Sequence, residues 1–278
     1  MPFYFTAGFL VLSGIASLTY QVTWVRLLGL SMGSTSAAIS TVLAAFFLGM
    51  ALGSYGAHRI TRQHTQNLKP YILLELLIGL TGLALLPVLL HLDSLLALFP
   101  AVGMALSFKF LVALILLSVP TLCMGATFPV MASILIRRQD EIGLRMSQLY
   151  SLNTAGAVAG AALSGFVFIP NWGLDGAIYI AFALNMTIVL IASYVDRRWT
   201  LPPIESAPVL TSPPASIEST TAPFRRHALI VLFATGWVSI ATQVGWTKYL
   251  VIFTGTTIYG FAIILIVFLS GKIGRAHV

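Results

Sequence analysis

Long apolar runs separated by short polar segments make up most of the chain. Six such runs precede residue 200, near 5–30, 36–57, 70–92, 108–136, 146–169 and 174–195. A helix of about 20 mostly apolar residues is long enough to cross the hydrocarbon core of a bilayer. The pattern therefore predicts an all-α, polytopic membrane protein whose first bundle, residues 1–198, contains six spanning helices.

Two segments depart from this simple pattern. The run at 108–136 contains Pro120 and Pro129, which lack a backbone donor and predict a kink whose freed carbonyls are satisfied by neighbouring helices. The apolar stretch 92–105 is interrupted at Pro100 and Gly103. It is too short for another crossing, so it predicts an interfacial or re-entrant piece.

The composition changes after residue 198. Residues 199–228 are rich in Pro, Ser and Thr and contain few large apolar side chains. Such a segment cannot bury enough surface to offset the entropy cost of ordering it. We expect a disordered cytoplasmic linker there, followed by further apolar runs near 229–253 and 256–270.

The run after this linker repeats the first run at a constant shift of 222 residues. The aligned polar and aromatic pairs include Gln21 with Gln243, Trp24 with Trp246 and Arg26 with Lys248. Six crossings separate the two copies, so both point the same way across the membrane. This arrangement predicts a parallel repeat in which residues 229–271 begin a second bundle.

The repeat breaks at Gly271. Residues 272–278, KIGRAHV, replace the expected counterpart of MALGSYGAHR, so the last apolar run stops after about 15 residues and is too short to cross. The same seven residues resemble one translated frame of a common sequencing adapter. We therefore expect a truncated chain with a non-native tail at 272–278.

Composition and charge agree with a bilayer as the surrounding solvent. Hydrophobic residues make up 58% and charged residues 8% of the chain, and the mean hydropathy is +0.95. The net charge of +7 does not form one basic stripe with interleaved aromatics, so we expect no nucleic-acid binding.

Ten of the fifteen Lys and Arg residues instead follow the second, fourth and sixth runs, whereas Lys109 lies at the edge of the fourth run and Arg26 within the first. The ten are Arg59, Arg62, Lys69, Arg137, Arg138, Arg145, Arg197, Arg198, Arg225 and Arg226. Because cytoplasmic loops carry an excess of Lys and Arg, this distribution predicts a cytoplasmic N-terminus. We expect a multi-pass protein of a bacterial plasma membrane.

Polar groups inside the first run are candidate binding residues. Tyr20, Gln21, Trp24 and Arg26 lie in TYQVTWVRLL, residues 19–28. Gln21 could bond a ligand in a pocket wall while Arg26 offers a positive charge to an anion. Alternatively, Gln21 bridges two helices and Arg26 extends to the interface or pairs with a carboxylate, which we favour.

The second copy supplies the corresponding candidates Gln243, Trp246 and Lys248. Lys248 keeps the positive charge of Arg26 without its forked guanidinium, which argues against a strict bidentate carboxylate site.

Glu75 is the only acidic residue well inside a predicted span. It could act as a proton or cation relay. A carboxylate near a helix N-terminus also complements the helix dipole and could pair with Arg59 or Arg62, and we favour this reading. One carboxylate is too few to match the several ammonium groups of a polyamine.

Asn153 and Asn185 are amides in apolar surroundings. For Asn153 we favour an interhelical hydrogen bond over a ligand contact. The small residues of GAVAG at 156–160 and of GMALG at 49–53 predict close approach between helices.

Motifs for catalysis or for cofactor binding are missing from the sequence. The five histidines form no HExxH motif or catalytic triad, no P-loop is present, and Cys123 is the single cysteine. We expect no cofactor and no metal, and we interpret Cys123 as a small buried hydrophobe.

Three stretches, 13–54, 120–132 (PTLCMGATFPVMA) and 149–174, together resemble the membrane region of a family of fused proteins. That family joins a major-facilitator-like helical region to a spermidine synthase-like domain. The resemblance implies an aminopropyltransferase-like domain after the helices and a link to polyamine biosynthesis. No Gly-rich loop after a strand occurs here, so the sequence lacks that catalytic domain.

Three functions follow from these observations. The first is the membrane portion of such a fusion, with the bilayer and the spermidine synthase-like domain as partners, which anchors or supplies the missing enzyme. The second is a stand-alone major-facilitator-type transporter of a small molecule, and the third is a membrane scaffold. An α/β domain encoded beyond Gly271 would favour the first, and four further helices followed by a stop would favour the second.

Overall fold

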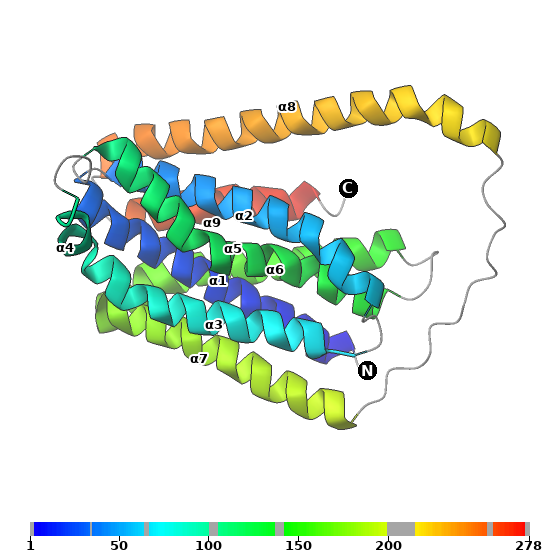
Figure 1. The fold of residues 1–278 in the computed structure, drawn as a ribbon, viewed down its shortest axis with the longest axis horizontal. Coiled ribbons are helices and arrows are strands. Elements are labelled where there is room, and N and C mark those ends of the chain that lie inside the picture. The colour runs from blue at the N-terminus through cyan, green and yellow to red at the C-terminus, as the bar shows by residue number, and fades with distance from the viewer. Residues whose placement is uncertain are drawn as a thin grey trace.

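The computed structural model is a bundle of long helices that lie side by side (Figure 1). It describes residues 3–33, 35–63, 67–99, 105–136, 142–198, 215–254 and 258–275. Within these ranges every regular element is a helix, which confirms the all-α prediction. The elements are α1 (Phe3–Met32), α2 (Thr35–Gln63), α3 (Lys69–Leu90), α4 (Leu92–Leu96), α5 (Leu106–Leu135), α6 (Ile142–Leu163), η2 (Ser164–Phe168), α7 (Ile169–Arg198), α8 (Ala215–Thr254) and α9 (Ile258–Arg275).

Six helical segments of the described chain are long and apolar enough to cross a bilayer. They are Phe5–Met32, Ala37–Ala57, Lys69–Leu90, Leu106–Leu135, Gly143–Arg198 and His227–Thr247. Their length and hydropathy confirm a multi-pass membrane protein in contact with lipid.

The segment Gly143–Arg198 contains a reversal of the chain. It has 56 residues, far more than the ~20 needed for one crossing. At Gly173 the backbone adopts φ 70° and ψ −174°, a region that is open essentially to glycine alone. The turn lies between the runs predicted at 146–169 and 174–195, and Figure 1 shows that α6 begins at the same end of the bundle where α7 stops.

Glycines let α6 lie directly on α1. A Cβ atom added to Gly156 would come within 2.3 Å of the Val11 carbonyl oxygen, and one added to Gly160 within 2.6 Å of the Ile15 carbonyl oxygen. Real Cβ atoms do not approach backbone so closely, so only glycine permits this separation. The close approach predicted from GAVAG is confirmed.

The α2 and α5 helices form a second close pair. A Cβ atom on Gly125 would lie 2.4 Å from the Met50 Cα, and one on Gly53 would lie 2.0 Å from the Leu122 carbonyl oxygen. Ser54 Oγ donates a 2.8 Å hydrogen bond to the Gly125 carbonyl oxygen, which Pro129 leaves without its usual helical donor. This bond helps α5 to remain one helix through both of its prolines, with the freed carbonyl satisfied by a neighbour as expected.

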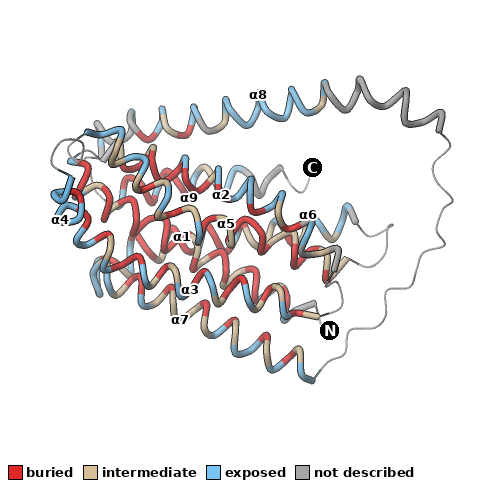
Figure 2. The backbone as a smooth tube through the Cα atoms, viewed as in Figure 1, coloured by how far each residue is buried: buried red, intermediate tan, exposed pale blue. Residues whose placement is uncertain are grey.

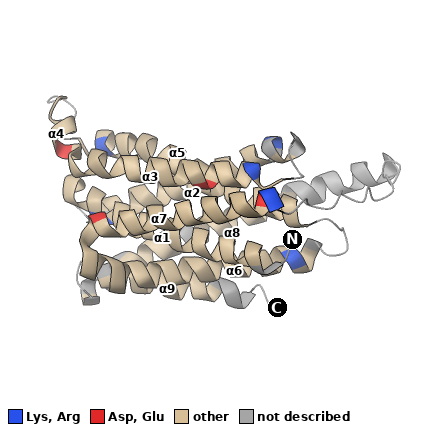
Figure 3. Cartoon of the chain, turned by 90° about the horizontal axis from the view of Figure 1, so that it is seen from below, with Lys and Arg blue, Asp and Glu red and all other residues tan. Residues whose placement is uncertain are grey.

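Glu75 is buried within the bundle, whereas other charged side chains lie near its two ends. Asp196 Oδ1, near the end of α7, accepts a 2.7 Å hydrogen bond from the Leu68 amide at the start of α3. At the opposite end Lys109 Nζ donates to the Ser31 carbonyl oxygen and lies 4.0 Å from Asp93 Oδ1. Figure 3 shows most of the coloured Lys and Arg positions at the end that holds the N-terminus.

The short helix α4 lies at the end of the bundle opposite the N-terminus (Figure 1). It has five residues and is not among the candidate spans, so the stretch 92–105 does not supply a further crossing through its described part. Pro100 and Gly103 lie outside the described residues.

The last two helices, α8 and α9, differ in how far they are buried. The helix α8 begins at Ala215, inside the segment expected to be a linker, and residues 199–214 lie outside the described part. Figure 2 shows α8 exposed along most of its described length. The helix α9 packs on α6 and buries Phe261, Ala262 and Leu265. The second bundle and the domain boundaries stay predictions.

Replacing Gly156 with alanine should push α6 away from α1. We expect Gly156→Ala to lower the free energy of unfolding by about 1–3 kcal/mol, because its methyl group would overlap the Val11 backbone. Gly8→Ala in α1 is the matched control, since nothing lies within 4 Å of the added atom. Thermal unfolding in detergent, followed by circular dichroism, measures both; equal melting temperatures for the two variants would contradict the close packing.

Candidate functional site

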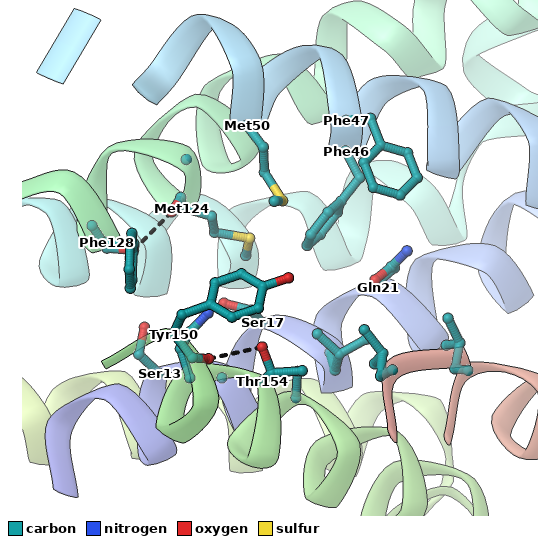
Figure 4. A pocket seen from close by; sticks show the side chains of 18 of the residues that line it. Ser13, Ser17, Gln21, Phe46, Phe47, Met50, Met124, Phe128, Tyr150 and Thr154 are labelled. Atoms are coloured by element: carbon teal, nitrogen blue, oxygen red, sulfur yellow. Dashed lines mark hydrogen bonds between the residues drawn. The ribbon is translucent and has the colours of Figure 1, made fainter. Parts of the chain in front are cut away.

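A cavity of about 290 Å³ lies between the α1/α6 pair and the α2/α5 pair. This volume is at the small end of the ~300–1,000 Å³ typical of ligand pockets. Figure 4 shows Phe46, Met50 and Met124 pointing toward it from one side and the ring of Tyr150 from the other. Residues of α8 and α9, among them Gln243 and Leu265, complete the lining.

Hydrogen-bonding groups line this cavity on the α1, α2, α5, α6 and α8 helices. They include Ser13, Ser17, Gln21, Asn153, Thr154 and Gln243. Among the described residues that line it, none carries a charged side chain. The cavity therefore combines neutral polar groups with aromatic and methionine surfaces.

Gln21 and Gln243, which the predicted repeat aligns at a shift of 222 residues, line the same cavity. Both are almost completely buried, with 4% and 3% of their surface exposed. Gln243 Oε1 has no hydrogen-bond partner within the described structure. A buried polar atom without a partner costs about 1–3 kcal/mol, so a ligand that donates a hydrogen bond there would recover this energy.

Asn153 also lines the cavity, on the α6 helix. Its backbone carbonyl oxygen lies 2.6 Å from the position of a Cβ atom on Gly14, which shows how closely α6 and α1 approach beside the cavity. Thr154 is less available to a ligand, because its hydroxyl donates to the Tyr150 carbonyl oxygen at 2.8 Å.

Glu75 lies beside the cavity in the core and is fully buried. Ser13 Oγ donates to Glu75 Oε1 at 2.7 Å, and Asn185 Nδ2 donates to Glu75 Oε2 at 2.7 Å. The carboxyl group thus ties α3 to α1 and α7 through neutral partners. This arrangement differs from the expected pairing with Arg59 or Arg62, and the Arg62 side chain lies outside the described residues.

Ser13 has two roles because it lines the cavity and also bonds Glu75. One hydroxyl group therefore separates the cavity from the buried carboxyl. Sequence reasoning did not single out Ser13, whose small side chain is common in apolar helices. The available signal was that Ser13, Glu75 and Asn185 are polar groups in three different apolar runs.

Tyr20 and Trp24 face a different part of the core. Their rings stack with centroids 5.3 Å apart and planes at 23°. The Tyr20 ring packs against Gly82 of α3, where an added Cβ atom would lie 2.6 Å from it. Neither residue is part of the cavity lining, so the structure separates them from Gln21.

The other candidates lie outside the cavity lining. Arg26 is partly buried in the last two turns of α1. Trp246 is 55% exposed on α8 and contacts Tyr249 edge-on, with ring centroids 5.9 Å apart. The Lys248 side chain lies outside the described residues. Across the described chain, no three His, Cys, Asp or Glu residues cluster as metal ligands.

Comparisons of the chain with models of protein families, with curated proteins and with solved structures found no match. The fold itself supports a helical membrane protein with six candidate spans. The resemblance to the fused spermidine synthase-like family stays a prediction from the three sequence motifs.

Removing the amide of Asn185 should destabilise the core. We expect Asn185→Leu to lower the free energy of unfolding by about 2 kcal/mol, because Glu75 Oε2 would lose a hydrogen bond in a buried site. Thr187→Val on the same helix is the control, since the exposed Thr187 hydroxyl bonds only the Ala183 carbonyl oxygen in its own helix. Chemical denaturation of both variants tests this, and a loss no larger than that of the control would argue against the Glu75 network.

Proposed function

We propose that the chain forms a membrane-embedded binding site for a small neutral molecule that has both a polar and an apolar part. The observation that carries this proposal is the cavity, which Gln21 and Gln243 line together with aromatic, methionine and leucine side chains. Pockets with a few convergent polar groups in apolar surroundings are typical small-molecule sites.

The neutral lining favours a neutral ligand. An ion that enters a bilayer-depth cavity loses its hydration shell, and without an opposite charge that loss is not compensated. A polyamine carries several ammonium groups, whereas the described lining offers no carboxylate to any of them. Amide and hydroxyl groups can satisfy a neutral donor or acceptor without such a cost.

The location of the cavity favours the carrier among the functions expected from the sequence. It is lined by helices of the first bundle together with α8 and α9, which carry the second copy of the repeat. In secondary transporters built from repeats, the substrate lies at the interface of the halves. We therefore propose a major-facilitator-type carrier, with residues 229–271 as the start of its second half.

The second candidate is the membrane portion of a spermidine synthase-like fusion protein. The three motifs at 13–54, 120–132 and 149–174 favour it. In that case the cavity would serve the neighbouring enzyme domain as a point of supply, or the helices would only anchor it.

We also infer the orientation of the helices in the membrane. Arg59, Lys69, Arg145 and Arg197 lie near the end of α2, the start of α3, the start of α6 and the end of α7, which are on the same side of the bundle as the N-terminus (Figure 1). Asp93 and Lys109 lie at the opposite end. The excess of positive charge supports a cytoplasmic N-terminus, as in a bacterial plasma membrane.

A series of three isosteric probes tests the ligand class. We expect benzamide, which is neutral, to bind the reconstituted protein at least about tenfold more tightly than benzoate or benzamidine, which carry the same ring and a charge. Gln243→Leu should weaken benzamide binding about tenfold through loss of one hydrogen bond. Equilibrium dialysis of radiolabelled probes measures the affinities.

Thr235→Val is the control for this series, because the exposed Thr235 on α8 bonds only carbonyl oxygens of its own helix. Tighter binding of benzoate or benzamidine than of benzamide would contradict a neutral site. An unchanged affinity for benzamide in Gln243→Leu would contradict a hydrogen bond between the ligand and Gln243. A preference for spermidine would favour the second candidate.

Cysteine labelling tests the orientation. In a Cys123→Ser background, we expect a membrane-impermeant maleimide to label Asp93→Cys on intact cells and Lys69→Cys only after permeabilisation, because the two exposed positions lie at opposite ends of the bundle. The reverse pattern would place the N-terminus outside.

A further inference from the structure

We propose that Glu75 is a proton-binding site coupled to the cavity through the Ser13 hydroxyl, so that a ligand and a proton are bound together. This inference rests on the proposed binding of a neutral ligand in the cavity. It adds the coupling ion, which the cavity alone does not specify.

The geometry supplies the link between the two sites. Ser13 has one hydroxyl proton, which it donates to Glu75 Oε1 at 2.7 Å while its side chain also lines the cavity. The same proton cannot bond a ligand and Glu75 at once. A ligand acceptor next to Ser13 therefore competes directly with the carboxylate for this donor.

A ligand that takes the hydrogen bond of Ser13 leaves Glu75 Oε1 without this donor. Glu75 is fully buried, and the hydrogen bond from Asn185 to its other oxygen and the contact with the Tyr71 hydroxyl remain. A buried carboxylate that is left with too few donors is costly unless it takes up a proton. A proton from the aqueous phase would bind Oε1, and the new O–H group would donate to Ser13 Oγ while Ser13 donates to the ligand.

A proton is the cation best suited to neutralise the Glu75 carboxylate. The titratable groups that act on it are the phenols of Tyr71 on α3 and Tyr20 on α1, and α7 contributes the neutral Asn185. Among the described residues, no Lys or Arg forms an ion pair with Glu75. Buried carboxyl groups of this kind in membrane bundles serve as proton relays.

The coupling has a defined thermodynamic sign. If the ligand favours the protonated form of Glu75, then by reciprocity a proton favours ligand binding. Affinity should rise as the pH falls, up to about tenfold per pH unit for one linked proton. At a pH above the pKa of the unliganded Glu75 carboxyl, binding should remove about one proton from the buffer per ligand.

Calorimetric titration of benzamide into the full chain in nanodiscs tests the proposal. Measurements in buffers of different ionisation enthalpy count the protons that accompany binding. We expect uptake of about one proton per benzamide in the wild type. Glu75→Gln should bind benzamide with a pH-independent affinity and no proton uptake, because the neutral amide mimics the protonated carboxyl.

Two serine variants separate coupling from a general effect on the cavity. Ser13→Ala should reduce proton uptake to near zero, because it removes the only described link. Ser17→Ala, one turn further along α1 and also in the lining, should keep an uptake of about one proton even if its affinity changes. The thermal melting temperature of each variant confirms that it is folded.

Each outcome has a distinct meaning. Benzamide binding without proton uptake in the wild type, or uptake that persists in Glu75→Gln, would overturn the coupling and leave the binding site intact. Equal loss of uptake in both serine variants would overturn the role of Ser13. No binding of benzamide at any pH would overturn the proposed function and this inference with it.

Discussion

The Glu75 carboxyl is the group that most constrains the packing of the bundle. A buried carboxylate at membrane depth must find its hydrogen bonds within the protein. Glu75 takes them from Ser13 on α1 and Asn185 on α7, which holds three helices in one relative register. A slip of α1 or α7 by a single residue would move its donor away from the carboxyl, so the network selects one arrangement among many apolar packings.

The close helix pairs explain why a cavity lies next to this network. Glycines bring α6 against α1 and α5 against α2, so the backbones of each pair lie in close contact. Side chains such as Phe46, Met124 and Tyr150 fill only part of the space between the α1/α6 pair and the α2/α5 pair. Ser13 lies on α1, where its side chain lines the cavity and also bonds Glu75.

Much of the architecture could be predicted from periodicity and spacing. The apolar runs, the GAVAG packing motif and the satisfaction of a proline-freed carbonyl all depend on local chemistry, and the structure confirms them. The constant shift between Gln21 and Gln243 drew attention to two residues that line the same cavity. The partners of Glu75 could not be predicted, because Ser13 and Asn185 are 62 and 110 residues away from it in the chain.

The sequence by itself determined that this protein is helical and resides in a membrane, because length and hydropathy alone decide whether a helix can cross a bilayer. It also identified several of the buried polar groups, among them Gln21, Glu75 and Gln243, but not Ser13. Only the tertiary structure decided which of these groups meet. It placed Gln21 in the cavity and the neighbouring Tyr20 against Gly82, since adjacent helical residues point about 100° apart and face different helices.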